Sequence, residues 1–231
     1  MAIATAVKLK KVKQIKILHI SPKNTKLGKI PSFSLPAILS CPGKTEWCSK
    51  ACYAAKIERI YNNAAKAYSD NFAISNSLEF VELMNIEIAK LTKKGINTFR
   101  FHVSGDISTI KYMYDLLSIV KANPTMRFYA YTKSWRVPGF LPHLEIFRSQ
   151  PNVELFASLD DEILALNEWP PNEWRVAYVG DKDINTFMSF SNKQTIACPQ
   201  QKNSKFTCDK CKFCFNKILE KTTKSVYFIK H

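Results

Sequence analysis

Hydrophobic and polar positions follow two different periods along this chain. Runs of about four to eight residues rich in aromatic and β-branched side chains predict strands, and amphipathic stretches of about a dozen residues predict helices between them. The predicted strands span residues 14–21, 30–37, 98–103, 127–131, 153–157 and 174–179, and the predicted helices span 49–71, 77–94, 109–122 and 141–149. This alternation predicts βαβ units and a parallel sheet.

The fold class that follows is α/β, a partial (β/α) barrel of about six parallel strands with a C-terminal cysteine-rich module. Residues 1–28 are expected to form a basic arm with one strand, 29–190 the barrel, and 191–231 a four-cysteine, lysine-rich module. No apolar run approaches the roughly 20 residues that span a bilayer, and residues 1–16 lack the apolar stretch of a secretory signal. We therefore expect a cytoplasmic protein without a membrane partner.

The positive charge of the chain is concentrated near its two ends. The net charge is +15, of which residues 1–29 contribute +8 (eight lysines, no acid) and residues 201–231 contribute +6 (eight lysines, two acids). A basic surface of this size attracts polyanions, so nucleic acid is the expected partner of the lysine-rich termini. The alternative is that the lysines only maintain solubility or reflect an AT-rich genome.

Seven cysteines fall into two clusters, separated by 145 residues without any cysteine. The first cluster is Cys41, Cys48 and Cys52, and the second is Cys198, Cys208, Cys211 and Cys214. An odd number in a chain without a secretory signal argues against a disulfide framework. Because C-x2-C spacing lets two thiolates reach one metal, the clusters predict metal binding.

Two metals suit the four terminal cysteines. Three of them in C-x2-C-x2-C spacing favour a [4Fe–4S] cluster, and Zn²⁺ held by four thiolates is the alternative. A third arrangement is a single cluster that takes one terminal cysteine as its fourth ligand, since seven ligands do not divide into two sets of four.

Polar residues end four successive predicted strands, and the three-cysteine loop follows a fifth. In parallel α/β folds the ligand lies at the carboxyl ends of the strands, so these groups predict a common site. The candidates for catalysis are Ser104, Asp106, Lys133 and Asp160. His102 is expected to pack inward rather than to act as a base. Tyr53, Tyr129, Tyr131 and Trp135 are candidates for base stacking, although aromatic residues in strands more often belong to the core.

The order of these features resembles the radical S-adenosylmethionine enzymes: a strand, a three-cysteine loop ending in Cys52-Tyr53, a helix, and a strand ending in Ser104-Gly105-Asp106. The resemblance implies a [4Fe–4S] cluster on Cys41, Cys48 and Cys52 with one open iron that takes S-adenosylmethionine. It also implies that Ser104, Gly105 and Asp106, with Tyr53, contact that cofactor.

Residues 29–216 resemble more closely the gene-product-eighty-eight-like family, found mainly in phages and mobile elements. The matching segments are residues 31–37, 41–42, 48–54, 100–106, 129–133, 157–160 and the terminal cysteines. The combined expectation is an iron–sulfur, radical S-adenosylmethionine-like enzyme acting on nucleic acid or a nucleic-acid-bound substrate. The alternative is a non-catalytic metal-containing protein that binds DNA or RNA in phage replication or host takeover.

Overall fold

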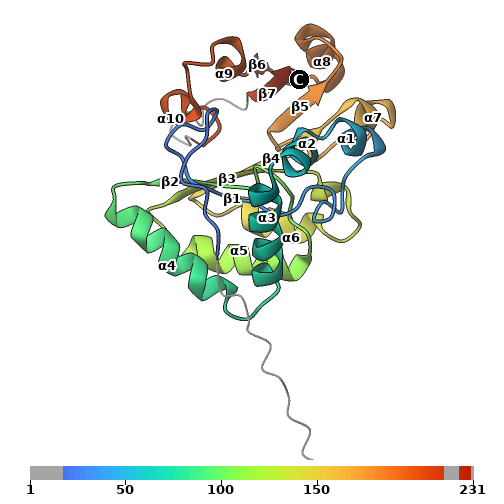
Figure 1. Cartoon of the computed structure of the whole chain (residues 1–231). Coiled ribbons are helices and arrows are strands. Elements are labelled where there is room, and N and C mark those ends of the chain that lie inside the picture. Colours follow the sequence, from blue (N-terminus) through green and yellow to red (C-terminus); the bar gives the residue numbers. More distant parts are fainter. Residues whose placement is uncertain (1–17, 216–223, 230–231) are drawn as a thin grey trace, which may run out of the picture.

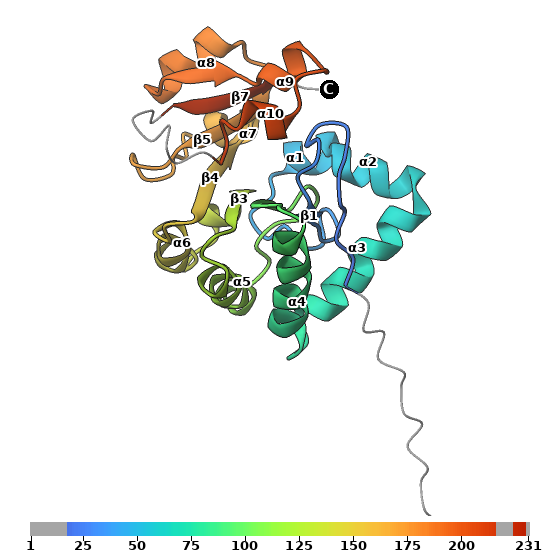
Figure 2. The ribbon, with the colours of Figure 1, turned by 90° about the vertical axis from the view of Figure 1, so that its left-hand side faces the viewer.

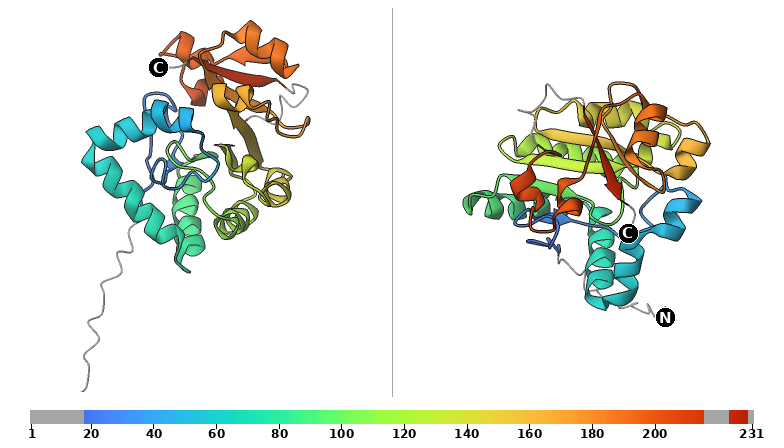
Figure 3. Two further views of the ribbon diagram at one scale, coloured as in Figure 1. Left: turned by 90° about the vertical axis from the view of Figure 1, so that its right-hand side faces the viewer. Right: turned by 90° about the horizontal axis from the view of Figure 1, so that it is seen from above.

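A seven-stranded parallel sheet organises the computed structural model, which describes residues 18–215 and 224–229. The strand order is β1-β2-β3-β4-β5-β7-β6, and every neighbouring pair is parallel. Figure 3 shows the sheet from the side and from above. The strands are β1 Ser32–Phe33, β2 Thr98–Phe101, β3 Arg127–Thr132, β4 Val153–Leu159, β5 Val176–Gly180, β6 Thr195–Ala197 and β7 Ser225–Ile229.

Helices connect these strands. They are α1 Glu46–Ala51, α2 Tyr53–Ile60, α3 Asn62–Ser75, α4 Phe80–Lys93, α5 Ile110–Ala122, α6 Leu141–Arg148, α7 Asp161–Ala165, α8 Ile184–Ser191, α9 Pro199–Lys202 and α10 Cys208–Cys211, with a 3-10 turn at Ser134–Arg136. Figure 2 shows α4, α5 and α6 side by side below β1 to β4 (see also Figure 1). None of the described helices is long and apolar enough to cross a membrane.

Alternation along the strands gives the two faces of the sheet different partners. Phe99 and Phe101 of β2 belong to the large core beneath α4 to α6, together with Phe128 of β3. Tyr129, one position along, belongs instead to a cluster on the opposite face with Leu27, Ile30 and Phe215. The second face of the sheet is therefore covered by segments from both ends of the described chain.

The α/β class and the parallel sheet are confirmed. The sheet is not closed into a barrel, although its layout is compatible with a partial one, and it has seven strands within the described ranges. The two strands that the hydrophobic pattern missed, β6 and β7, lie within residues 191–231 and extend this same sheet.

Three of the predicted elements differ most in extent, and most of the others differ by one to three residues at an end. Of the expected strand 14–21, residues 14–17 lie outside the described residues, and residues 18–21 contribute only an isolated antiparallel bridge between Ser21 and Ser32. The strand expected over 30–37 is reduced to Ser32–Phe33, since Pro31 and Pro36 cannot donate to a ladder. The helix expected over 49–71 is interrupted by extended backbone at Cys52 and Tyr61.

Candidate metal centre

The three-cysteine loop lies over the carboxyl ends of the strands. After β1 the chain continues beside the end of β2, where the Leu35 amide donates to the Ser104 carbonyl at 3.0 Å. The side chain of Thr45 caps α1 by accepting from the Cys48 amide at 2.9 Å. Cys41 precedes this helix and Cys52 separates α1 from α2, so the loop and the two short helices place the three thiols along one cavity.

A cavity of about 220 Å³ contains the three thiols together with most of the predicted site. Its lining includes Cys41, Cys48, Cys52, Tyr53, Ser104, Gly105, Asp106 and Lys133. Asp160 is fully buried behind Lys133, to which it is paired. Residues as far apart in the chain as Ala37 and Val179 therefore meet at one end of the sheet.

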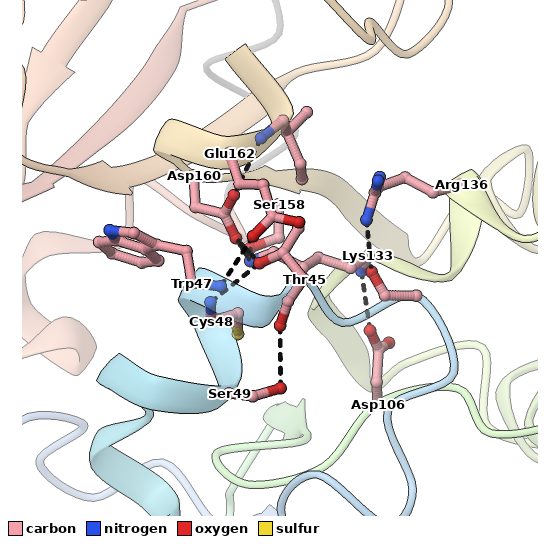
Figure 4. A network of polar contacts seen from close by, with 12 residues as sticks. Thr45, Trp47, Cys48, Ser49, Asp106, Lys133, Arg136, Ser158, Asp160 and Glu162 are labelled. Carbon is pink, nitrogen blue, oxygen red and sulfur yellow. Dashed lines mark hydrogen bonds and ion pairs between the residues drawn. The ribbon is translucent and has the colours of Figure 1, made fainter. Parts of the chain in front are cut away.

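A buried polar network fixes the loop to β3 and β4 (Figure 4). Lys133 Nζ lies 3.2 Å from Asp160 Oδ2, and Thr45 Oγ1 donates to the same carboxylate oxygen at 2.6 Å. Asp160 Oδ1 accepts from the Ile163 amide at 3.1 Å, which caps α7. The Asp160 carboxylate thus joins the loop, the β3 end and α7.

Asp106 is also engaged within the protein. Its carboxylate accepts from the backbone amides of Lys133 and Ile107, each at 2.7 Å. Burial raises the pKa of Asp106, while a hydrogen bond from Thr132 and those two amides oppose the rise. Asp106 therefore lines the cavity and at the same time holds the turn after β3.

Ser104 and Tyr53 secure the neighbouring elements. Ser104 Oγ donates to Glu58 Oε1 at 2.8 Å, and the same oxygen accepts from the Ala37 amide at 2.7 Å. Tyr53 Oη donates to the Val103 carbonyl at 2.8 Å while half of the side chain stays exposed. These contacts join α2, the segment after β1 and the end of β2.

Two glycines allow the close approach of loop and strand ends. Gly105 has a φ of +84°, and a Cβ on it would lie 2.5 Å from Ser40 Oγ. A Cβ on Gly43 would collide with the Lys133 carbonyl oxygen. Larger side chains at either position would push the cysteine loop away from the sheet.

The other sequence candidates have mainly structural positions. His102 is buried as expected, and its Nε2 lies 2.9 Å from Tyr112 Oη. Burial, together with the nearby positive charge of Arg100, lowers its pKa to about 3. Tyr129 and Trp135 are buried in the core.

The four terminal cysteines meet at a second, smaller cavity of about 20 Å³. Cys198 follows β6, and its amide donates to the Tyr227 carbonyl of β7 at 2.9 Å. Cys208 begins α10, where its amide donates to the Lys26 carbonyl at 2.9 Å. Cys198 thus lines the same cavity as the other three terminal cysteines.

Cations surround these terminal thiols. Burial raises the pKa of Cys208 to about 11, and Arg100 and Lys26 oppose the rise. Burial likewise raises the pKa of Cys214 to about 12, opposed in part by Arg175. Two positive side chains, Lys26 of the N-terminal segment and Arg100 of β2, therefore line the second cavity, and Arg175 before β5 lies near Cys214.

Arg100 is the site residue that the sequence prediction missed. It lines both cysteine cavities, as does Tyr131, and its guanidinium carbon lies 5.0 Å from the Tyr131 ring centre. The available signal was its place between Phe99 and Phe101, since alternation puts it on the face opposite these rings.

The thiols of both cavities suit a thiolate-bound metal, although they do not converge on the position of a single ion. Within the described ranges, no three or more His, Cys, Asp or Glu side chains are placed to hold one metal ion. In a [4Fe–4S] cluster each thiolate binds a different iron, so its ligands line a shared space. Burial and nearby Asp106 raise the pKa of Cys41 to about 12, so a bound cation would be needed to deprotonate it.

The two lysine-rich segments lie beside each other where they are described. Besides the Lys26–Cys208 bond, the Lys29 amide donates to Asp209 Oδ2 at 3.1 Å (Figure 1, blue loop beside α10). Lys29, Lys94, Arg127 and Lys212 line a common cavity of about 360 Å³ in which Asp209 is the only acidic lining residue among those described. Residues 1–17 and 216–223, which hold further lysines, lie outside the described residues.

These features define an α/β protein with a parallel sheet and two cysteine-lined cavities on one side of it. A family model described as "Gene product 88" matches residues 5–217, so the chain belongs to that family, as the sequence predicted. It is 25% identical to the Gene 88 protein of Mycobacterium phage L5 over 222 residues, which cover 87% of this chain and 90% of the relative. It is 22% identical to the Gene 88 protein of Mycobacterium phage D29 over 223 residues, with the same shares. These relatives support the predicted phage type; no solved structure matches the chain.

Proposed function

We propose that this chain is an iron–sulfur protein of radical S-adenosylmethionine-like type that acts on a nucleic acid or a nucleic-acid-bound substrate. Cys41, Cys48 and Cys52 would hold a [4Fe–4S] cluster. The observation that carries the proposal is the shared cavity of about 220 Å³, in which three thiols meet the ends of β2 and β3. A cluster bound by three thiolates would supply electrons and one iron open to an external ligand.

The cavity offers this chemistry a suitable electrostatic setting. Lys133 lies close enough to Cys48 to favour its thiolate, although burial still raises the pKa of Cys48 overall. Asp160 fixes the ammonium group of Lys133. The protein residues would thus hold the loop, balance the thiolate charge and limit access of water, as Ser104 and Asp106 line the remaining wall.

The nucleic-acid part of the proposal is supported by charge. The basic segments near both ends meet at Lys26–Cys208, and four cations share one cavity beside them. Non-specific binding to phosphate releases counterions and weakens with salt. We therefore infer that this combined basic region, together with the lysines of residues 1–16, binds the nucleic acid.

Anaerobic purification followed by iron, sulfide and zinc analysis tests the metal centre. We expect a brown protein with at least one [4Fe–4S] cluster, whose electron paramagnetic resonance signal changes when S-adenosylmethionine is added. Replacing Cys41, Cys48 and Cys52 together with Ala should remove this cluster. Replacing Cys211 with Ala is the matched control, because it should leave the first cluster in place. A colourless protein that contains only zinc would overturn the proposal.

The same preparations distinguish the metals of the terminal site. The cavity of about 20 Å³ has room for about one water-sized particle, so Zn²⁺ remains beside a second cluster as the candidate there. If Cys211→Ala loses zinc, the terminal site binds zinc; if it loses about four irons, the site holds a second cluster. Because thiolate–metal bonds contribute to folding, this variant should also lose more stability than the roughly 0.5 kcal/mol of an ordinary surface change.

Salt titration tests the nucleic-acid part. Removing residues 1–16 deletes five lysines. If about half of them contact phosphates, the slope of log affinity against log salt should flatten by about two. Binding that is indifferent to salt and to this truncation would leave the lysines as solubilising charge.

A non-catalytic, metal-containing nucleic-acid-binding protein is the second candidate. It is favoured by one observation: Asp106, Asp160 and Lys133 are all engaged in internal hydrogen bonds or ion pairs. Metal content and nucleic-acid binding that persist without any response to S-adenosylmethionine would favour this candidate.

A further inference from the structure

A fourth cavity, of about 320 Å³, adjoins the three-cysteine cavity and is not used by the metal centre. It lies between the N-terminal segment, α2, α3 and the end of β2. Its walls include five residues that also line the three-cysteine cavity, namely Tyr53, Ala54, Arg100, Val103 and Ser104. A ligand held here would therefore lie next to the three thiols.

The charged side chains that line this adjoining cavity are all basic. Lys26 and Arg100 line it, and none of its described lining residues is acidic. Arg100 Nε is buried without a hydrogen-bond partner among the described residues, and Nη2 has only a long bond of 3.3 Å to the His102 carbonyl. Neither Lys26 nor Arg100 forms an ion pair with a described carboxylate. Arg100 also stacks over Tyr129 and Tyr131 and faces the Cys208 thiol. Its unpartnered Nε is therefore the donor that a bound anion would satisfy.

The remaining walls are aromatic and apolar. Tyr53 and Tyr68 contribute their rings, and Leu27, Ala54, Ile57 and Val103 contribute aliphatic surface. Half of the Tyr53 side chain is exposed, which leaves ring surface available for stacking. A ligand that suits both parts carries an anionic group at one end and a flat ring at the other.

We propose that this adjoining cavity binds one nucleotide unit. The phosphate would contact Arg100 and Lys26, and the base would lie against Tyr53 and Tyr68. This inference rests on the proposed function, because it places the proposed nucleic-acid substrate beside the three-cysteine cavity. A free mononucleotide and one unit of a single strand both carry this phosphate and this base.

Isothermal titration of the full chain, purified anaerobically, tests this binding. The probes are deoxyadenosine monophosphate, deoxyadenosine, and a single strand of four deoxyadenylates. Because charged hydrogen bonds to the phosphate supply the selectivity, the monophosphate should bind about 10- to 100-fold more tightly than the nucleoside. Tighter binding of the strand than of the monophosphate would identify a strand as the source, and the reverse would identify the free nucleotide. Equal affinities for nucleoside and monophosphate would overturn the inference.

Two variants locate the phosphate contact. Lys26→Gln and Arg100→Lys should each weaken the monophosphate about tenfold or more and leave the nucleoside unchanged, since Lys cannot reproduce the planar fork of Arg. Lys23→Gln is the matched control: it removes the same charge from an exposed position in the same segment and should change neither affinity. If Arg100→Lys fails to fold by circular dichroism, Lys26→Gln alone decides. A monophosphate affinity in Lys26→Gln equal to that of Lys23→Gln would refute the site.

The iron content separates the two proposals. An iron-loaded protein that shows no preference for the phosphate refutes the nucleotide site and leaves the metal centre intact. A protein without iron that still binds the monophosphate through Lys26 refutes the metal centre and leaves the nucleotide site intact.

Discussion

Thr45 offers the sharpest test of how the cysteine loop is held on the sheet. Its buried hydroxyl donates to Asp160 Oδ2 at 2.6 Å and accepts from the Cys48 amide at 2.9 Å. The substitution Thr45→Val keeps the shape of the side chain and removes both bonds. The loop should then lose its bond to Asp160 and the cap of α1 together, while the Trp47 amide keeps its bond to Glu162 of α7 at 2.8 Å.

The expected loss follows from these two bonds. Removing a helix cap costs about 0.5–2 kcal/mol, and a hydrogen bond to a charged group contributes about 1.5–3 kcal/mol. Asp160 Oδ2 keeps its pairing with Lys133 at 3.2 Å, so the carboxylate is not left wholly unpaired. We therefore expect Thr45→Val to lower the free energy of unfolding by about 3 kcal/mol, or to lower Tm by roughly 6–12 °C for a domain of this size.

Guanidinium unfolding under reducing conditions measures this loss. Thr45→Ser is the control, because it keeps the hydroxyl and should remain within about 1 kcal/mol of the wild type. A Thr45→Val protein within about 0.5 kcal/mol of the wild type would refute the role assigned to the hydroxyl. So would a Thr45→Ser variant that is as unstable as Thr45→Val.

Three further predictions concern the same region. Lys133→Met should cost about 3–5 kcal/mol, because it leaves the Asp160 charge buried with no cation beside it. Adding Asp160→Asn should recover part of that loss, and unfolding curves of the two variants check both statements. The His102 pKa is 6.5 in the unfolded chain and about 3 when folded, so protons bind the unfolded state first as pH falls. Stability should decline between about pH 6.5 and pH 3 by at most about 1.4 kcal/mol per pH unit from this group, and His102→Phe should show a correspondingly shallower decline. Gly105→Ala should destabilise more than Gly95→Ala, since both have positive φ but only Gly105 lacks space for a Cβ; equal losses would show that contact with the loop is unimportant.

The sequence was sufficient for the parts of the fold that local pattern controls. Phe99, Phe101 and Phe128 show the alternation of strands with one buried face, and the strands confirm it. Because parallel strands end on the same side, the residues after them could be assigned to one site from the sequence alone. Cys41 and Lys133 do line the same cavity.

Pairings between distant segments could not be predicted in this way. The pattern of Thr195–Ala197 is too short to recognise, and β7 becomes a strand by lying between β5 and β6. The composition of residues 49–71 is helical throughout, so nothing local marks the extended backbone at Cys52. For Arg100, the cysteines that give it a role are about a hundred residues away in the chain.

The acidic residues illustrate the same limit at the level of single atoms. The sequence indicates that an acid follows β4, but it does not indicate which donors that acid meets. Asp160 meets Thr45, Lys133 and the Ile163 amide, which come from three separate elements. Such a partner set depends on the finished fold, whereas the position of a residue at a strand end depends only on its own strand.

The strand order β5-β7-β6 also has a consequence for biosynthesis. β6 is made before β7, yet its neighbour in the sheet is β7, so it has no place in the sheet until β7 has been synthesised. Cys198 depends on the same event, since its amide bonds to Tyr227 of β7. The strands β1 to β4 and the first three cysteines, in contrast, are all made by residue 159. As a chain emerges from the ribosome its early segments can fold first. The two cysteine sites should therefore mature in a fixed order, with the three-thiol site available to a metal donor well before the four-thiol site exists.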